Sequence, residues 1–304
     1  MKPMIRMDDA GTAGRVGMTL ATIAYKPLDR VADALANPDL ATQGRWALEW
    51  RVWGDGCQMF VARDDLTGQI AISIRGSAAS PQTEEFWIDW FEQDLNTLGL
   101  SPWLYGDGPR GAYVSWGSLD GLTSLLSLVD ERTTPETTLV EYLAAQQPFP
   151  GVVPVVGHGV GGTLAYMLAG YLQQHIGDRS LQFWPVTFGA PTAGNPAFAK
   201  WMEDEFAASA GRFYNTIDLV PHAWQTFARI EDSFPGAPKL PAGLRPLVVA
   251  MRELLTVLGD RYLQPGQGIA LEGRVRNRDS WFDEAGLQHA PATYLQLLGA
   301  PPVP

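Results

Sequence analysis

The sequence is poor in cysteine and in basic residues. Its one cysteine, Cys57, cannot form an intrachain disulfide, so the fold does not depend on an oxidising compartment. The chain has 22 basic and 33 acidic residues, a net charge of −11 and no basic run. Nucleic acids and anionic membrane surfaces are bound through clustered lysine and arginine, so neither is expected as a partner.

Histidine is also scarce. The four histidines, His158, His175, His222 and His289, are scattered along the chain. They form no His-x-x-x-His pair and have no carboxylates at metal-ligand spacing. We therefore expect neither a metal site nor a cofactor.

The sequence has no long uninterrupted hydrophobic run. Residues 142–177 contain no Asp, Glu, Lys or Arg, but prolines and glycines interrupt them throughout. This pattern predicts a loop, a strand, a turn and a helix rather than a transmembrane span. At the N-terminus, Asp8 and Asp9 precede the first apolar patch, which is not the pattern of a signal peptide. We expect a cytoplasmic protein, or one exported without a cleavable signal peptide.

What is present is the composition of a folded globular protein. The 304 residues are 46% hydrophobic and 18% charged, and no linker divides them, so one domain over 1–304 is expected. Apolar runs predict strands at 46–54, 57–64, 69–76, 152–157, 181–189, 212–215 and 268–275, the second and third forming a hairpin. Helical patterns occur at 28–36, on both sides of Pro135 within 123–147, and at 160–172, 196–210 and 247–259. This alternation predicts an α/β fold, a mostly parallel sheet flanked by helices on both faces.

The segment "VVPVVGHGVGGTL" has the layout of a nucleophile elbow, in which a strand turns sharply into a helix and holds up one reactive side chain. The elbow pattern is G-x-S-x-G, and here Gly159 stands where the serine belongs. In the helix that follows, residues 160–172 place apolar side chains on one stripe, which we expect to face the core. Taken alone, the glycines fit an ordinary strand-to-helix turn equally well.

Three other segments supply the partners that an elbow needs. Ser77 follows an expected strand and, with the backbone N–H of Val160, is a candidate donor of an oxyanion hole, although a turn serine is the plainer interpretation. Asp218 follows a later strand, where an acid that orients an imidazole belongs, or where a turn residue does. His289 then completes the chain order of nucleophile, acid and base.

The other histidines are interpreted as structural. His158 lies inside the turn, where a ring packs beneath it, and His175 stands at a helix end in solvent. His222 is too close in sequence to Asp218 to reach the turn. This elimination leaves His289 as the base.

Five sequence segments together resemble the class 3 lipase family, the fungal-lipase-like α/β-hydrolases. They are "RGS" before "WIDWFEQDL", then "GHGVGG", "TFGAPTAGNPAFA", "NTIDLVPH" and "HAPATY", in that order across residues 69–294. The resemblance implies an α/β-hydrolase fold and hydrolysis of lipid esters by a Ser-Asp-His mechanism. It assigns Asp218 and His289 to the triad, and Ser77 and Val160 to the oxyanion hole.

The resemblance also implies a lid in residues 78–95. Phe86, Trp87, Trp90 and Phe91 would give this lid an apolar face for a lipid or small ester substrate. A surface helix that packs these aromatic side chains onto the core fits the pattern as well. No protein partner is implied.

Glycine at position 159 has no hydroxyl, so no acyl-enzyme can form there, and the chain is expected to be inactive or strongly impaired. Three explanations remain open. The chain has naturally given up catalysis and kept its pocket to bind lipid or a protein partner, the serine has been removed deliberately, or His289 and Asp218 activate a water for slow direct hydrolysis. Thr163, one helical turn further on, is expected to point elsewhere.

Overall fold

The computed structural model describes residues 2–54, 56–76, 99–106, 108–146, 151–177, 181–206, 211–226, 230, 234, 239–257, 262–276 and 280–304. Its strands are β1 (Trp46–Gly54), β2 (Cys57–Asp64), β3 (Ile70–Ile74), β4 (Leu100–Pro102), β5 (Tyr113–Ser115), β6 (Val129–Asp130), β7 (Thr137–Thr138), β8 (Val152–His158), β9 (Gln182–Phe188), β10 (Gly211–Asn215) and β11 (Ile269–Leu271). Its α-helices are α1 (Ala10–Ile23), α2 (Leu28–Leu35), α4 (Trp116–Ser127), α5 (Leu139–Ala145), α6 (Val160–His175), α7 (Pro196–Phe206), α8 (Arg245–Val257), α9 (Trp281–His289) and α10 (Pro291–Leu297). Short 3-10 turns lie at η1 (Met7–Asp9) and η2 (Val220–His222).

The central sheet has seven described strands in the order β1-β2-β3-β8-β9-β10-β11. The first three strands pair antiparallel, and β3, β8, β9, β10 and β11 pair parallel. The carboxyl ends of β3, β8 and β10 therefore point to the same edge of the sheet. In open sheets of this kind, ligands bind at this edge.

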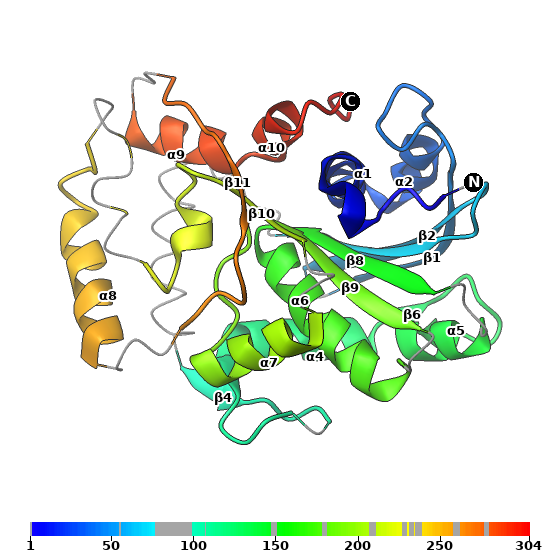
Figure 1. Ribbon diagram of the computed structural model, residues 1–304, viewed down its shortest axis with the longest axis horizontal. Helices are drawn as coiled ribbons and strands as arrows, with labels where there is room; N and C mark the ends of the chain where they lie inside the picture. The colour runs from blue at the N-terminus through cyan, green and yellow to red at the C-terminus, as the bar shows by residue number, and fades with distance from the viewer. Residues whose placement is uncertain are drawn as a thin grey trace.

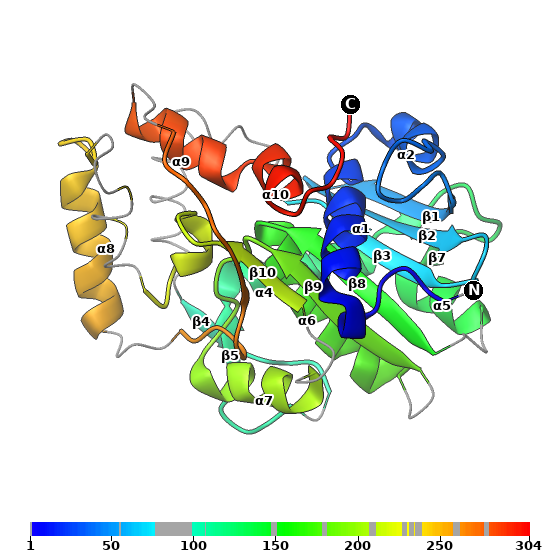
Figure 2. The ribbon, with the colours of Figure 1, turned by 45° about the horizontal axis from the view of Figure 1, so that its top comes forward.

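Helices cover both faces of the sheet, as Figures 1 and 2 show. On one face α4, α5, α6 and α7 share a hydrophobic core with the large side chains of β1, β2 and β3. On the other face α1, α2 and α10 pack on residues of the sheet such as Phe60 of β2, Val156 of β8 and Phe213 of β10. This arrangement confirms the expected α/β fold and explains why the inner strands are apolar on both sides.

A third hydrophobic cluster lies beyond β10, between η2, α8 and α9. Its largest members include Trp224, Phe234 and Trp281, and in Figure 1 α8 lies at the far left, away from the sheet. Its buried residues all come from the segment between Asp218 and His289. Because α9 carries His289 at its last position, this cluster helps to fix that histidine relative to the sheet.

Two expectations from the sequence need correction. Residues 128–138 are not helical around Pro135: β6 and β7 pair there, and the Asp130 carboxylate accepts the backbone N–H of Arg51 next to them. The predicted stripe on α6 does face the core, but it understates the burial of the helix, because residues on its other sides, such as Ala165, Ala169 and Gly170, are buried as well. The reason is that α6 lies between β8 and β9 on one side and α4 on the other.

The expected hairpin of β2 and β3 and the late strand β11 are present. The predicted Thr163 orientation is confirmed, since its Oγ1 donates to the carbonyl of Pro191, 2.8 Å away. Among the described residues, no helix is both long enough and apolar enough to cross a membrane.

Candidate active site

The turn between β8 and α6 has the backbone of an elbow. Gly159 adopts φ 58° and ψ −132°, a left-handed combination that strains any residue with a side chain. Its N–H donates to the carbonyl of Phe188 on β9, 2.9 Å away, so the strained residue is fixed to the sheet. Val160 is the first residue of α6, and an N–H at that position has no acceptor within the helix. The turn therefore presents a free donor next to the Gly159 alpha carbon.

Glycines around the turn permit very close backbone contacts. A Cβ on Gly157 would lie 2.1 Å from the carbonyl oxygen of Gly161, and one on Gly161 would lie 2.6 Å from that of Ile74. A Cβ on Gly76 would lie 2.5 Å from the carbonyl oxygen of His158. The chain leaving β3 therefore passes directly against the elbow, and the residue after Gly76 is the predicted oxyanion-hole serine, Ser77. Ser77 itself lies outside the described residues.

His289 reaches the elbow from the end of α9. Its Nε2 is 3.0 Å from the position that a Cβ on Gly159 would occupy, and its Nδ1 is 2.8 Å from Oδ2 of Asp218. The histidine is 8% exposed and Asp218 is fully buried. Because the carboxylate accepts, Nδ1 carries the proton, and the lone pair of Nε2 faces the glycine. The structure thus brings together Gly159, Asp218 and His289, which are far apart in the sequence.

Two further groups hold the Asp218 carboxylate. The Tyr294 hydroxyl donates to Oδ2 at 2.7 Å, and the backbone N–H of Val220 donates to Oδ1 at 3.0 Å. The same hydroxyl accepts the N–H of Asn215 at 3.1 Å, so it links β10 to α10. Burial, followed by the nearby Asp218 charge, raises the pKa of Tyr294 well above its ordinary value, so Tyr294 remains a donor at all ordinary pH values.

Replacing Tyr294 by phenylalanine is expected to lower the free energy of unfolding by about 1–3 kcal/mol. The change removes a donor from Asp218 and an acceptor from the Asn215 N–H, and both are buried. Urea unfolding measures this difference. Tyr113→Phe is the matched control, because that side chain is 38% exposed, and it should change stability little. An equal loss in both variants would contradict the assigned role.

The end of α9 is held to β10 by amide side chains. Asn215 Nδ2 donates to the main-chain carbonyl of Gln288 at 3.0 Å and to its Oε1 at 2.8 Å. Gln288 Nε2 in turn donates to Glu284 at 2.7 Å. All three side chains are buried. This network fixes the residue that immediately precedes His289.

The ring of His158 packs against the ring of His289 in a tilted arrangement. The two ring centroids are 4.5 Å apart with an interplanar angle of 31°. His158 is 1% exposed, and its Nδ1 is 2.9 Å from the hydroxyl of Tyr25, which follows the end of α1. Burial, and after it the neighbouring His289, hold the pKa of His158 well below its ordinary value. His158 therefore stays neutral and supports the other ring without adding charge.

This depressed pKa predicts a pH dependence of stability. Below about pH 6.5, the ordinary histidine pKa, His158 takes up a proton in the unfolded chain but not in the folded one. The unfolded state then binds more protons, so the free energy of unfolding falls as the pH drops, by up to about 1.4 kcal/mol per pH unit. Denaturant titrations at pH 5–7 measure this slope. His158→Gln should flatten the slope, whereas His175→Gln, at an exposed helix end, should leave it unchanged.

The remaining predicted residues have the following places. His175 is the last residue of α6 and is exposed, with its ring on Tyr171, and His222 lies in η2 with Nδ1 2.9 Å from Thr226 Oγ1. Neither reaches the elbow. The lid of residues 78–95, with Phe86, Trp87, Trp90 and Phe91, lies outside the described residues. Within the part of the chain that the structure describes, no group of His, Cys, Asp and Glu side chains could hold a metal ion.

Two tyrosines of the site could not be assigned a role from the sequence. Tyr294 belongs to "HAPATY", where the resemblance marks a tyrosine without a role. No spacing signal connects Tyr25 with His158, because 133 residues separate them. Only the fold, which packs α1 on β8, reveals that contact.

Comparison with known proteins places these residues in context. The family model described as Lipase (class 3) matches residues 71–227, just over half of the chain. The match includes Gly159 and Asp218 and ends before His289. A curated nematode protein, "Lipase ZK262.3" of Caenorhabditis elegans, is 28% identical over 170 residues, which are 56% of this chain and 42% of that protein. The matched segment therefore spans less than half the length of this relative.

Solved structures show the same fold. M37 lipase superposes with a TM-score of 0.80 at 23% identity, over 96% of this chain and 92% of the other. The nonglycosylated LIP2 lipase of Yarrowia lipolytica gives a TM-score of 0.59 at 16% identity, over 88% and 81%. The M37 match covers almost the full chain, whereas the family model matches just over half of it.

Proposed function

Because the chain belongs to the class 3 lipase family, we propose that Gly159, Asp218 and His289 form a carboxylic-ester hydrolase site whose nucleophile position is occupied by glycine. The substrate class is a lipid or small ester. With glycine at position 159, the chain is inactive or strongly impaired in acyl transfer. We also propose that residues 1–304 form one domain, since α10 packs on α1.

One observation carries this proposal: Nε2 of His289 lies 3.0 Å from the place of a missing Cβ at a residue with elbow geometry. In the Ser-His-Asp mechanism the imidazole accepts the proton of the serine hydroxyl while the acid holds the ring and its tautomer. Asp218 is placed for the second role and His289 for the first. An ordinary strand-to-helix turn does not require a buried imidazole–carboxylate pair beside its glycine, whereas a hydrolase site does.

The electrophilic side of the reaction needs donors for the developing oxyanion. The free N–H of Val160 supports its assignment as one donor, and we assign Ser77 as the second. We further propose that Phe86, Trp87, Trp90 and Phe91 contact the lipid from a lid. These assignments follow the family pattern and the direction in which the chain leaves β3.

Glycine changes the chemistry without disturbing the scaffold. No oxygen is covalently available at residue 159, so the acyl group has no acceptor on the protein. A water molecule on Nε2 is the remaining nucleophile, and loss of the serine in such sites costs on the order of 10⁶-fold in kcat. Glycine suits the left-handed backbone better than serine does, so the fold gains from the exchange.

The test compares hydrolysis of a short-chain p-nitrophenyl ester by the chain and by Gly159→Ser. The proposal requires activity to appear with the hydroxyl. The alternative is a lipase-like protein that binds lipid or a protein partner without catalysis. It predicts no gain with serine and binding that the substitution leaves unaltered.

A further inference from the structure

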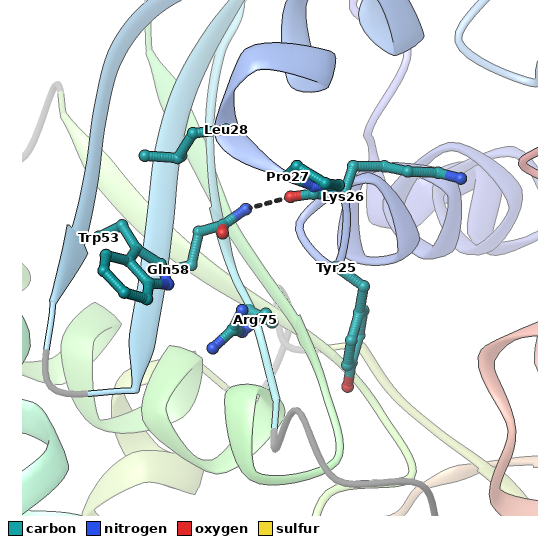
Figure 3. A pocket seen from close by; sticks show the side chains of 7 residues that line it. All are labelled: Tyr25, Lys26, Pro27, Leu28, Trp53, Gln58 and Arg75. Carbon is teal, nitrogen blue, oxygen red and sulfur yellow. Dashed lines mark hydrogen bonds between the residues drawn. The ribbon is translucent and has the colours of Figure 1, made fainter.

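An open pocket of about 430 Å³ lies beside the end of β3, and neither Gly159, Asp218 nor His289 lines it. Figure 3 shows the seven residues that line it: Tyr25, Lys26, Pro27, Leu28, Trp53, Gln58 and Arg75. They come from the connection between α1 and α2 and from the ends of β1, β2 and β3. Its volume is within the range of small-molecule sites in proteins.

Arg75 is the charged group of this pocket with unused hydrogen-bonding capacity. Its Nη2 donates to the carbonyl of Gly56 at 2.6 Å, and its Nε is buried without a partner. Among the described residues it has no ion pair, unlike Arg45 and Arg63, which bind carboxylates. A guanidinium in this state can still donate hydrogen bonds to both oxygens of a carboxylate in a bidentate pair.

The rest of the pocket favours a single negative charge. None of the lining residues is acidic. Lys26 directs its ammonium group away from the other side chains, as Figure 3 shows, and donates to the Pro304 carbonyl. The N-terminus of α2, at Leu28, adds partial positive charge to the same place. One guanidinium and the partial charge of a helix N-terminus balance the single charge of a carboxylate better than the double charge of a phosphate.

The other part of the pocket is apolar. Trp53 is 61% exposed, although it stands in a strand whose other tryptophans, Trp46 and Trp50, are buried. Its ring and Leu28 lie on one side of Arg75 in Figure 3. Pro27 extends the apolar lining. An exposed indole beside an unpaired guanidinium suits a ligand with a hydrocarbon body and a charged end.

We propose that this pocket binds aliphatic monocarboxylates, with the carboxylate on Arg75 and the hydrocarbon chain against Trp53 and Leu28. The binding needs no nucleophile at Gly159 and does not depend on the proposed hydrolysis. Tyr25 lines the pocket and also forms a hydrogen bond with His158, whose ring packs against His289. A ligand in the pocket would therefore contact a residue that helps to position His289.

The experiment is calorimetric titration of the purified full-length chain with octanoate. Arg75→Gln and Trp53→Ala should each weaken binding about tenfold or more, a change equivalent to about 1.4 kcal/mol. Octan-1-ol has the same hydrocarbon chain without the charge. It should bind the original protein more weakly than octanoate does, whereas Arg75→Gln should bind the two ligands with equal affinity. Arg30→Gln is the matched control, since Arg30 is an exposed arginine on α2 outside the pocket.

Several results would overturn the proposal. One is equal octanoate affinity in the original chain and in both pocket variants. Another is a loss caused by His289→Ala but not by Arg75→Gln, which would move the ligand to the candidate active site. Circular dichroism melts establish that the variants are folded. If Arg75→Gln does not fold, Trp53→Ala decides alone, because that exposed side chain is not part of the core.

Discussion

Gly159→Ser is expected to raise kcat for a p-nitrophenyl ester by about 10⁴-fold or more over the original chain. The substitution supplies the one group that the site lacks, next to an imidazole already held by Asp218 at 2.8 Å. The new Cβ would lie 3.0 Å from Nε2, so the His289 ring must withdraw by a few tenths of an ångström. Initial rates at saturating substrate measure the gain.

Two controls separate the hydroxyl from other effects of the substitution. Gly159→Ala adds the Cβ and the same backbone strain without the oxygen, and it should give no gain. Gly159→Ser combined with His289→Ala keeps the oxygen and removes the base, and it should lose most of the gain. A rise in activity with alanine would contradict the assigned chemistry, as would an inert but folded serine variant.

The same substitution is expected to cost stability. A residue with a side chain at φ 58° and ψ −132° carries strain of about 1–3 kcal/mol, which glycine avoids. The free energy of unfolding should therefore be lower in both the serine and the alanine variants. Urea titration measures it. Activity and stability thus favour different residues at this position.

The second large effect is expected from Asp218→Asn in the Gly159→Ser background. An amide in place of the carboxylate can donate to Nδ1 of His289, which moves the ring proton to Nε2 and removes the lone pair that faces residue 159. In serine hydrolases this change lowers kcat by about 10⁴-fold while the geometry is preserved. Ester hydrolysis over a range of pH measures the loss.

Asp204→Asn is the matched control for this effect. Asp204 is an exposed carboxylate on α7, paired with Lys200 at 2.8 Å, and its amide should leave kcat unchanged. Val220 can still donate to the amide oxygen, but the Tyr294 hydroxyl loses its acceptor, because the amide nitrogen takes the place of Oδ2 that it shares with His289. Melting curves are therefore needed to distinguish a chemical loss from unfolding. A folded Asp218→Asn variant with full activity would remove Asp218 from the proposed site.

Much of the fold was predictable because its signals are local. The apolar runs and glycine turns of β8, α6 and β9 occur within short windows, and their order gives an α/β sheet. The short pairs β4-β5 and β6-β7 were not predicted, since strands of two or three residues have no periodicity. The full burial of α6 depends on α4 packing on it from a distant part of the chain, which a stripe of apolar residues does not reveal.

The site was predictable only as a set of candidate residues. Chain order selected Asp218 and His289, and the structure places them in contact beside Gly159. The positions of Tyr25 and Tyr294 could not be predicted, because each depends on a helix that packs against the sheet from one end of the sequence. Such contacts have no fixed spacing and are set by tertiary packing alone.

Tyr25 and Tyr294 therefore have a consequence for biosynthesis. The cluster of rings and carboxylate uses residues that lie far apart in the polypeptide, so it cannot assemble until the ribosome has released residue 294. A nascent chain would carry the elbow long before it carried the base. In a serine-bearing version, hydrolytic capacity would therefore appear only after residue 294 had been synthesised.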